Sequence, residues 1–261
     1  MATYLDAIVA RHRAESAADE RSLADLRARV EGMPATRGFA AALRARSTAG
    51  ELAVISEIKR RSPSKGALNV DLDPADLARR YVDGGAACLS VLTDAESFGG
   101  SVDDLREAAG AVDVPVLRKD FTVSQQDVYD ARAMGADCVL LIAAALSAAE
   151  LADFHGLARS IELDVLVEVH DERELEVALV IGATLVGVNQ RDLVTFEVDH
   201  ERAVRLAGAI PADVVRVAES GVRDADDARS LRDAGYDAIL VGETLVTAAD
   251  PTATLASLRL I

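Results

Sequence analysis

The chain has 261 residues, of which 44 are acidic and 28 basic, so its formal net charge at pH 7 is −16. Such an acidic surface argues against nucleic acid and anionic membranes as partners, because both select a basic footprint on the protein. The sequence has no apolar run near the ~20 residues that span a bilayer and no secretory signal at its start, so we expect a cytoplasmic protein.

Residues 1–50 are predicted to form two or three amphipathic helices. Apolar side chains recur at helical spacing in three stretches, which contain Leu5, Ile8 and Val9, then Leu23, Leu26 and Val30, then Phe39 and Leu43. Since no long linker follows, we expect an N-terminal helical extension packed on residues 51–261, the two parts forming one domain overall.

Residues 51–261 repeat one pattern, in which a short apolar run is followed by a polar loop, a helical segment and a glycine. Six helix starts are marked by predicted N-caps, which are Asp73, Ser101, Ser124, Ser147 (with Glu150 three residues on), Asp171 and Asp250. The predicted strands are 53–59, 87–93, 114–120, 137–144, 164–169, 184–189, 214–220 and 237–243. Their apolar runs are continuous, as in parallel strands covered by helices. Eight such units in ~210 residues predict an α/β fold, a single (β/α)8 TIM barrel. A doubly wound sheet is the alternative, and its G-x-G-x-x-G turn is missing from the sequence.

Cysteines and histidines show no pattern of a metal site. Cys88 and Cys138 each lie inside a predicted strand and are interpreted as small buried hydrophobic residues. The four histidines have neither metal spacing nor evident partners, so we assign no role to them; they are His12, His155, His170 and His200. No metal and no cofactor are predicted.

Polar residues interrupt the predicted strands at their carboxyl ends, where TIM barrels carry their active sites. These residues are Glu57, Lys59 and Ser62, then Lys119 with Asp120, Glu168, Asn189 with Arg191, Glu219-Ser220-Gly221, and Gly242-Glu243. Any single pair, such as Lys119 with Glu168, would equally serve as a structural ion pair. A whole ring of charges at one mouth is costly unless the charges pair with one another or meet a ligand, and of these we predict a ligand site.

A second pattern indicates that this ligand carries an anionic group. The strand ends ESG and VGE place glycines where backbone N–H groups can approach a phosphate, and Ser62 is expected across the mouth. Four basic residues also follow the first strand in a chain that is otherwise acidic. Of these, we expect Lys59 to face the site, and Arg60, Arg61 and Lys65 to point outward or pair locally.

Seven stretches together resemble the indole-3-glycerol-phosphate synthase family of tryptophan biosynthesis. They are SEIKRRSPSKG, LTDAESFGGS, LRKDF, LVEVHDERELE, GVNQRDLVTFEVD, AESGV and VGETL. The resemblance covers essentially the whole chain, and the E-x-K-x-x-S-P-S and N-x-R-D-L-x-T-F runs are its most specific parts. It implies a lyase that closes an indole ring on 1-(2-carboxyphenylamino)-1-deoxyribulose 5-phosphate, with loss of CO₂ and water.

The resemblance also implies catalytic roles. Lys119 is expected to be the general acid that protonates the ketone, with a pKa lowered by burial and by Lys59. Lys59 is expected to clamp the benzoate carboxylate, and its share in the dehydration step stays open. Glu168 is expected to be the base of the dehydration, with Glu57 orienting both Glu168 and the lysines by hydrogen bonds. Asn189 and Glu219, with Ser220, are expected to fix the substrate hydroxyls and the amine.

The binding roles follow in the same way. Arg191 is expected near the carboxylate, and the phosphate is assigned to Ser62, Gly221, Gly242 and the backbone of Glu243. Phe121, Leu140 and Leu193 are expected to line the slot for the aromatic ring. We expect a monofunctional monomer that needs no cofactor, acts on a small phosphorylated substrate and binds neither nucleic acid nor membrane.

Two departures from the family pattern put loop detail in doubt, namely 123–126 after KDF and Glu243-Thr244 after the eighth strand. Three other functions stay as alternatives. A phosphoribosylanthranilate isomerase-like barrel would not need two lysines, Lys59 and Lys119, at the mouth of the barrel. A Schiff-base aldolase would need one lysine at a strand end, but not the second lysine together with Arg191. A non-catalytic phospholigand-binding or scaffold barrel would be expected to lack at least one of the charged residues.

Overall fold

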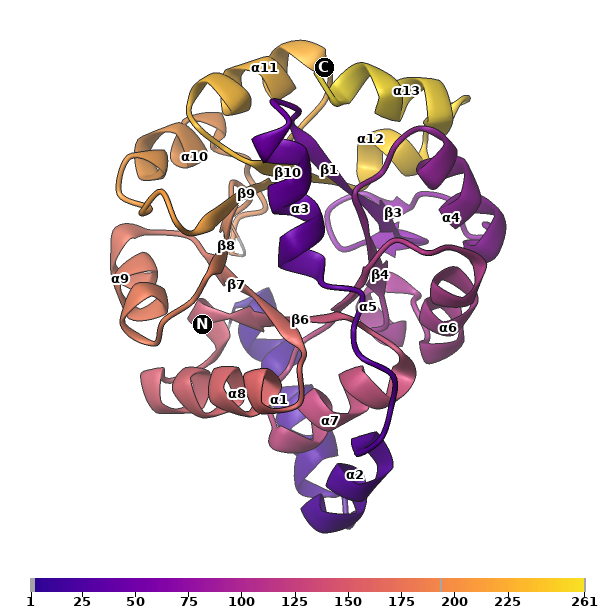
Figure 1. The fold of residues 1–261 in the computed structure, drawn as a ribbon. Helices are drawn as coiled ribbons and strands as arrows, with labels where there is room; N and C mark the ends of the chain where they lie inside the picture. Colours follow the sequence, from indigo (N-terminus) through magenta and orange to yellow (C-terminus); the bar gives the residue numbers. More distant parts are fainter. Residues whose placement is uncertain (1–2, 193, 261) are drawn as a thin grey trace.

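The computed structural model describes residues 3–192 and 194–260. In this part of the chain eight parallel strands close into a barrel in the order β1-β10-β9-β8-β7-β6-β5-β4, surrounded by helices (Figure 1). The strands are β1 (Ala53–Ile58), β4 (Cys88–Leu92), β5 (Val116–Lys119), β6 (Cys138–Ile142), β7 (Asp164–Val169), β8 (Leu185–Asn189), β9 (Val215–Glu219) and β10 (Ala238–Val241). The predicted (β/α)8 barrel is therefore confirmed, with each strand end within a few residues of its predicted place.

Helices cover the outside of the barrel. They are α4 (Pro74–Asp83), α6 (Val102–Ala111), α7 (Gln125–Met134), α8 (Ala148–Ser160), α9 (Glu172–Val180), α10 (His200–Ala207), α11 (Ala225–Asp233) and α13 (Pro251–Leu258). Six of these eight begin at a predicted cap, whereas α10 and α11 begin at Asp199 and Asp224, which were not predicted. Ser147 and Glu150 form a complete capping box at the start of α8.

Short elements at the strand ends escaped prediction. They are the β2–β3 hairpin (Arg61–Ser62 and Gly66–Ala67), α5 (Ala95–Phe98), the 3₁₀ turn η1 (Ala143–Ala145) and α12 (Glu243–Val246). Their two to four residues are too few to show a period in the sequence.

The N-terminal helices pack on the barrel at different places. They are α1 (Tyr4–Ala17), α2 (Leu23–Val30) and α3 (Phe39–Thr48). In Figure 1 α3 crosses the near end of the barrel, α1 lies fainter behind it, and α2 stands beside α7 at the lower edge. The fully buried Phe39 and Leu43 of α3 join the apolar side chains inside the barrel, so α3 closes the amino-terminal end.

Three apolar clusters hold the described part of the fold together. One fills the barrel interior, a second packs the outer faces of the strands against the helices, and a small third joins α2 to α7 through Leu26, Val30 and Tyr129. Cys88 and Cys138 are free thiols in the inner cluster, and burial raises their pKa well above the ordinary range, as expected of buried hydrophobic residues. None of the helices in the described ranges is long and apolar enough to cross a membrane.

Candidate active site

A cavity of about 500 Å³ opens at the carboxyl ends of the strands. Fourteen of the fifteen predicted site residues line it, and they are Glu57, Lys59, Ser62, Lys119, Phe121, Leu140, Glu168, Asn189, Arg191, Glu219, Ser220, Gly221, Gly242 and Glu243. The fifteenth, Leu193, lies outside the described residues. The barrel topology thus brings together residues that are up to 186 positions apart, because every parallel strand delivers its last side chains to the same end.

All three lysines of the chain line this cavity. The sequence contains Lys59, Lys65 and Lys119, whereas the other 25 of its 28 basic residues are arginines. A lysine ammonium changes its protonation state far more readily than a guanidinium. The chain therefore places every side-chain amine it has where a proton could be exchanged with a ligand.

Lys119 lies between two buried carboxylates. Its ammonium donates to Glu168 Oε2 and to Glu219 Oε2, each at 3.0 Å. The side chains of Glu168 and Glu219 are 2% and 1% exposed, so neither charge is screened by water. One ammonium can neutralise only one of the two carboxylates. Lys119, Glu168 and Glu219 together therefore carry one excess negative charge, unless one of the carboxylates binds a proton.

The pKa values in this group are displaced in different directions. For Lys119 burial favours the neutral amine, but Glu168, Glu219 and then Glu57 outweigh it and raise the pKa. For Glu168 burial favours the acid, but the ammonium of Lys119 and then His170 outweigh it and lower the pKa. Burial raises the pKa of Glu219, which Lys119 opposes and Glu168 reinforces. Of the two carboxylates, Glu219 therefore binds an extra proton more readily.

The expected lowering of the Lys119 pKa is wrong. It assumed that Lys59 would be the dominant neighbour, but Lys59 is engaged with Glu57 at 2.6 Å, while Lys119 faces carboxylates. The expected orientation of Glu168 by Glu57 is not seen either. Asn189 donates its amide to Glu168 Oε1 at 3.1 Å, and Lys119 holds the other oxygen.

Gly242 has a steric role beside the Lys59–Glu57 pair. A Cβ at this position would overlap Glu57 Oε1 and lie 3.1 Å from Lys59 Nζ. The glycine at the end of the eighth barrel strand therefore leaves room for the ion pair.

The cavity as a whole is balanced in charge. It is lined by the five cations Lys59, Lys65, Lys119, Arg191 and Arg223 and by the five carboxylates of Glu57, Asp120, Glu168, Glu219 and Glu243. The basic residues that follow β1 have different partners in the structure. Arg60 turns away to Asp104 at 3.0 Å, a local structural role as expected, whereas Lys65 reaches Glu243 across the mouth at 3.6 Å.

The end of the cavity at β9 and β10 is built largely from backbone. Ser220 and Gly221 have φ of 68° and 78°, and two successive residues in the left-handed region turn the chain sharply at the end of β9. A serine in this region is strained, and such strain gathers at functional sites. A Cβ on Gly221 would also lie 2.5 Å from Val198, so glycine is needed there. Ser62 lines the same cavity, and its hydroxyl accepts the N–H of Lys65.

Apolar side chains line the opposite side. Phe121 and Leu140 lie there together with Phe98, whose ring centroid is 6.3 Å from that of Phe121. Helix α1 completes this side with Tyr4, Leu5 and Ile8, which also line the cavity. The N-terminal extension therefore forms part of the site, which the sequence had left open.

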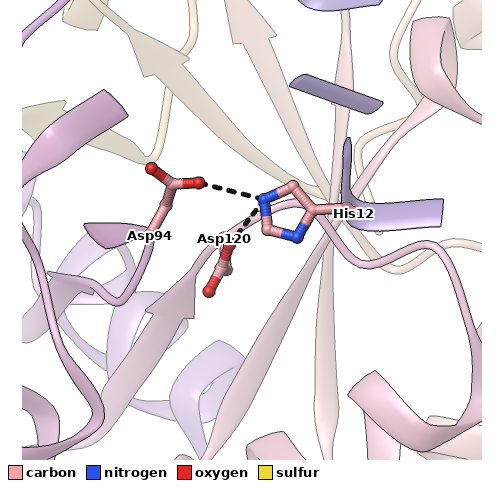
Figure 2. Close-up of side chains that lie close together, drawn as sticks. All are labelled: His12, Asp94 and Asp120. Carbon is pink, nitrogen blue, oxygen red and sulfur yellow. Dashed lines mark hydrogen bonds and ion pairs between the residues drawn. The ribbon is translucent and has the colours of Figure 1, made fainter. Parts of the chain in front are cut away.

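Figure 2 shows a contact that joins α1 to the barrel mouth. His12 Nε2 lies 3.0 Å from Asp94 Oδ2 and 3.7 Å from Asp120 Oδ1. The grouping of an imidazole with two carboxylates resembles a metal site. However, the guanidinium of Arg11 also contacts Asp94, and that of Arg118 lies 3.0 Å from Asp120. Because these cations already neutralise the carboxylates, we interpret the group as an ion-pair network.

Several residues of the site region were missed by the sequence analysis, and they include His12, Asp94 and His170 as well as Phe98, His200 and Arg223 of the cavity lining. His12 and His170 were given no role, and Asp94 was not singled out although it follows directly after a predicted strand. His170 Nε2 lies 3.6 Å from Glu168 Oε1, and Asp94 caps α5 besides contacting α1. The position of Asp94 after a strand was a usable signal; the histidines gave none.

Arg191 lies at the mouth as expected, with its guanidinium donating to the carbonyl of Phe196 at 2.9 Å and its backbone N–H to the side chain of Asn189 at 3.0 Å. These two bonds fix the loop after β8. The remaining N–H groups of the guanidinium stay available to a ligand in the cavity.

Comparisons with known proteins identify relatives over the whole length of the chain. The family model "Indole-3-glycerol phosphate synthase" matches residues 5–258. Proteins named indole-3-glycerol phosphate synthase are 49% identical in Polaromonas sp. strain JS666, over 99% of this chain and 98% of that protein, and 47% identical in Polaromonas naphthalenivorans, over 99% of both. A third, from Verminephrobacter eiseniae, is 49% identical over 99% of both.

Solved structures with the same fold are more distant. Thiamine phosphate pyrophosphorylase from Pyrococcus furiosus superposes with a TM-score of 0.60 at 18% identity, over 79% of this chain and 93% of that chain. The N-acetylmannosamine-6-phosphate 2-epimerase from Clostridium perfringens gives 0.58 at 14% identity, over 75% and 87%. At these identities the likeness supports the barrel fold alone.

Proposed function

Because the chain belongs to the indole-3-glycerol phosphate synthase family, we propose that it closes the indole ring of 1-(2-carboxyphenylamino)-1-deoxyribulose 5-phosphate. The reaction forms indole-3-glycerol phosphate and releases CO₂ and water, which makes the protein a carbon–carbon lyase of tryptophan biosynthesis. The observation that carries the proposal is Lys119, a buried ammonium held between Glu168 and Glu219 on the floor of a cavity of about 500 Å³.

The substrate fits the two ends of the cavity. Its phosphate is proposed to lie over the strained turn at Ser220 and Gly221, with Ser62 and the backbone at Gly242 and Glu243 facing it. Its aromatic ring is proposed to lie between Phe121 and Leu140. Lys59 and Arg191 would then meet the benzoate carboxylate and bend the substrate so that its two reacting carbons approach each other.

The chemistry needs one acid and one base. As the ring carbon that bears the carboxylate attacks the ketone carbon, Lys119 donates a proton to the ketone oxygen. CO₂ then leaves, and its bonding electrons restore the aromatic ring. In the dehydration the new hydroxyl departs as water, for which an ammonium supplies the proton, and Glu168 removes a proton from the substrate. The lowered pKa keeps Glu168 ionised but makes it a weak base while Lys119 carries its proton, so Glu168 becomes a stronger base once Lys119 has given that proton to the substrate.

The raised pKa of Lys119 bears on its role as the acid. An ammonium bound by two carboxylates is a weak acid until its partners change. The substrate carries negative charge into the cavity, and a proton on Glu219 offsets it. We therefore propose that Glu219 serves as a proton reserve beside Lys119, in addition to its contact with substrate hydroxyls.

The wider setting is proposed on the same basis. The protein is taken to act in the cytoplasm as a monofunctional monomer without a cofactor. Its net charge of −16 supports the absence of nucleic acid and anionic membranes as partners.

The test is product formation by the purified protein, followed by indole fluorescence, beside Lys119→Ala. Turnover that falls by at least about 10²-fold in the variant supports the general-acid role. Turnover that survives would keep the reaction and move the proton to Lys59. Tight binding of the substrate by the wild-type protein without turnover would contradict the proposal and favour a non-catalytic barrel.

A further inference from the structure

His170 follows β7 directly, two residues after Glu168, and its ring is fixed by α9. Glu174 Oε2 accepts the backbone N–H of His170 at 2.8 Å and lies 3.2 Å from its Nδ1. The backbone N–H of Glu174 donates to the capping side chain of Asp171 at 2.8 Å, which fixes the first turn of α9 from which this carboxylate extends. A carboxylate accepts hydrogen bonds and does not donate them when ionised, so Nδ1 carries a proton.

The other ring nitrogen faces the active-site carboxylate. Nε2 is buried, has no hydrogen-bond partner in the described part of the chain and lies 3.6 Å from Glu168 Oε1. A neutral ring protonated at Nδ1 would turn the Nε2 lone pair toward a negative charge. The imidazolium turns an N–H toward it instead, which makes the charged ring the stable form at this position.

The remaining charges around the ring support this assignment. Burial favours the neutral ring, and Arg202 on α10 acts in the same direction, but Glu174 and Glu168 outweigh them and raise the pKa of His170. On the other side Glu168 faces Lys119, which also holds Glu219.

We propose that His170 is a positioning residue for Glu168, holding Oε1 of the carboxylate while Lys119 holds Oε2. The inference rests on the proposed function, because it concerns the base of that reaction. Asn189 donates to the same Oε1 at 3.1 Å from the side of β8. The carboxylate is therefore fixed by Asn189 and His170 at one oxygen and by Lys119 at the other. His170 does not line the cavity, so it acts through Glu168 and not on the substrate.

The first test compares two neutral replacements of His170. His170→Asn keeps a donor near the Nδ1 position, toward Glu174, and removes the contact with Glu168. His170→Gln places an amide near the Nε2 position and keeps a donor toward Glu168. We expect kcat to fall about tenfold in His170→Asn and less in His170→Gln, with KM within twofold of wild type in both.

The pH profile separates positioning from a structural role. Loss of the cation removes one of the charges that keep Glu168 ionised, so its pKa rises in both variants. The acid limb of kcat/KM is therefore expected to move up by about one pH unit. Because Glu168 and Glu219 both contact Lys119, the apparent pKa of the acid limb belongs to the two coupled carboxylates together and not to Glu168 alone.

His155→Asn is the matched control. His155 is buried on α8 and does not line the cavity, so this variant measures the effect of losing a buried imidazole elsewhere. It is expected to leave the pH profile unchanged. His170→Asn with an unshifted acid limb, or with a loss of kcat that only follows its loss of thermal stability as in His155→Asn, would overturn the inference.

Imidazole NMR of the resting protein gives a readout that does not depend on turnover. The His170 ring is expected to titrate above its ordinary pKa, and Glu168→Gln is expected to lower that pKa by removing a negative charge. An unchanged His170 titration in Glu168→Gln would contradict the inference whatever the reaction. Failure of the wild-type protein to form product would contradict only the proposed function.

Discussion

Gly187 leaves the space that the carboxylate of Glu219 occupies: a Cβ on Gly187 would overlap Glu219 Oε1. Gly187 lies in β8, whose register pairs it with Val217 of β9, and its backbone is not in the left-handed region. The requirement for glycine is therefore steric. It links a residue without a side chain to the position of a carboxylate that lines the cavity.

We expect Gly187→Ala to reduce kcat/KM by about 10²-fold, because Glu219 must move away from Lys119 and displacements near 1 Å have effects of this size. Steady-state kinetics measure the loss, and circular dichroism shows whether the fold is retained. Gly156→Ala is the control. A Cβ on Gly156 in α8 meets nothing within 4 Å, so that variant should keep full activity and gain ~0.5–1 kcal/mol of stability. Equal activity in both variants would contradict the steric role.

Glu219→Gln is expected to stabilise the protein more at alkaline than at acid pH, relative to wild type. Burial raises the pKa of Glu219 from 4.5 to about 7. The folded state thus holds this proton more tightly than the unfolded state, and the contribution is lost as pH rises from 4.5 through 7. Thermal unfolding of both proteins at pH 5 and pH 8.5 measures the difference. A constant difference in Tm at the two pH values would show that Glu219 titrates normally.

Loss of the contact between α1 and the barrel mouth is expected to weaken substrate binding. His12→Ala removes the 3.0 Å contact with Asp94 and the packing of its ring on Phe121, whose centroid lies 5.4 Å away. We expect about 1 kcal/mol lower stability of α1 docking and a KM about fivefold higher, with kcat little changed. Limited trypsin digestion should also cut α1 faster.

Arg27→Ala is the control for that experiment, because the Arg27–Glu31 pair is exposed and lies outside the cavity. Exposed pairs of this kind contribute less than ~1 kcal/mol. Its KM and digestion rate should match those of the wild type. If His12→Ala behaves in the same way, α1 does not depend on this contact.

Leu43→Ala is expected to lower the free energy of unfolding by about 3 kcal/mol without changing KM. Leu43 is fully buried in the cluster that fills the barrel from its amino-terminal end, so the substitution leaves a cavity there. Urea unfolding measures the loss and also tests whether residues 1–50 belong to one domain with the barrel. Two separate transitions would show that the extension folds independently.

The fold was predictable because each of its elements is marked locally. Continuous apolar runs indicated the strands, and caps such as Ser147 with Glu150 indicated the helices. In a barrel of parallel strands, the polar residues at the carboxyl ends of all strands lie at the same end, so they could be predicted to form one site. Neither pattern identified α5 and α12, because a helix of four residues is too short to show a helical periodicity in the sequence.

What could not be predicted depends on distances between residues far apart in the chain. His12 meets Asp94 across 82 positions, and neither residue carries a local sign of the other. The protonation of Lys119 depends on whether Lys59 or Glu168 is the nearer neighbour, which the residue types leave undecided. The gathering of all lysines at the strand ends, by contrast, could have been read directly from the sequence.

That gathering has a practical consequence for any experiment that modifies amines. Because Lys59, Lys65 and Lys119 all line the cavity, reductive methylation with ¹³C-formaldehyde would place every labelled side-chain methyl group at the active site. Apart from the signal of the N-terminal amine, such labels would report on ligand binding with no background from side chains elsewhere on the surface. Lys65, the most exposed of the three, is the side chain that amine coupling would modify most readily, and molecules attached through it would be held by the rim of their own cavity.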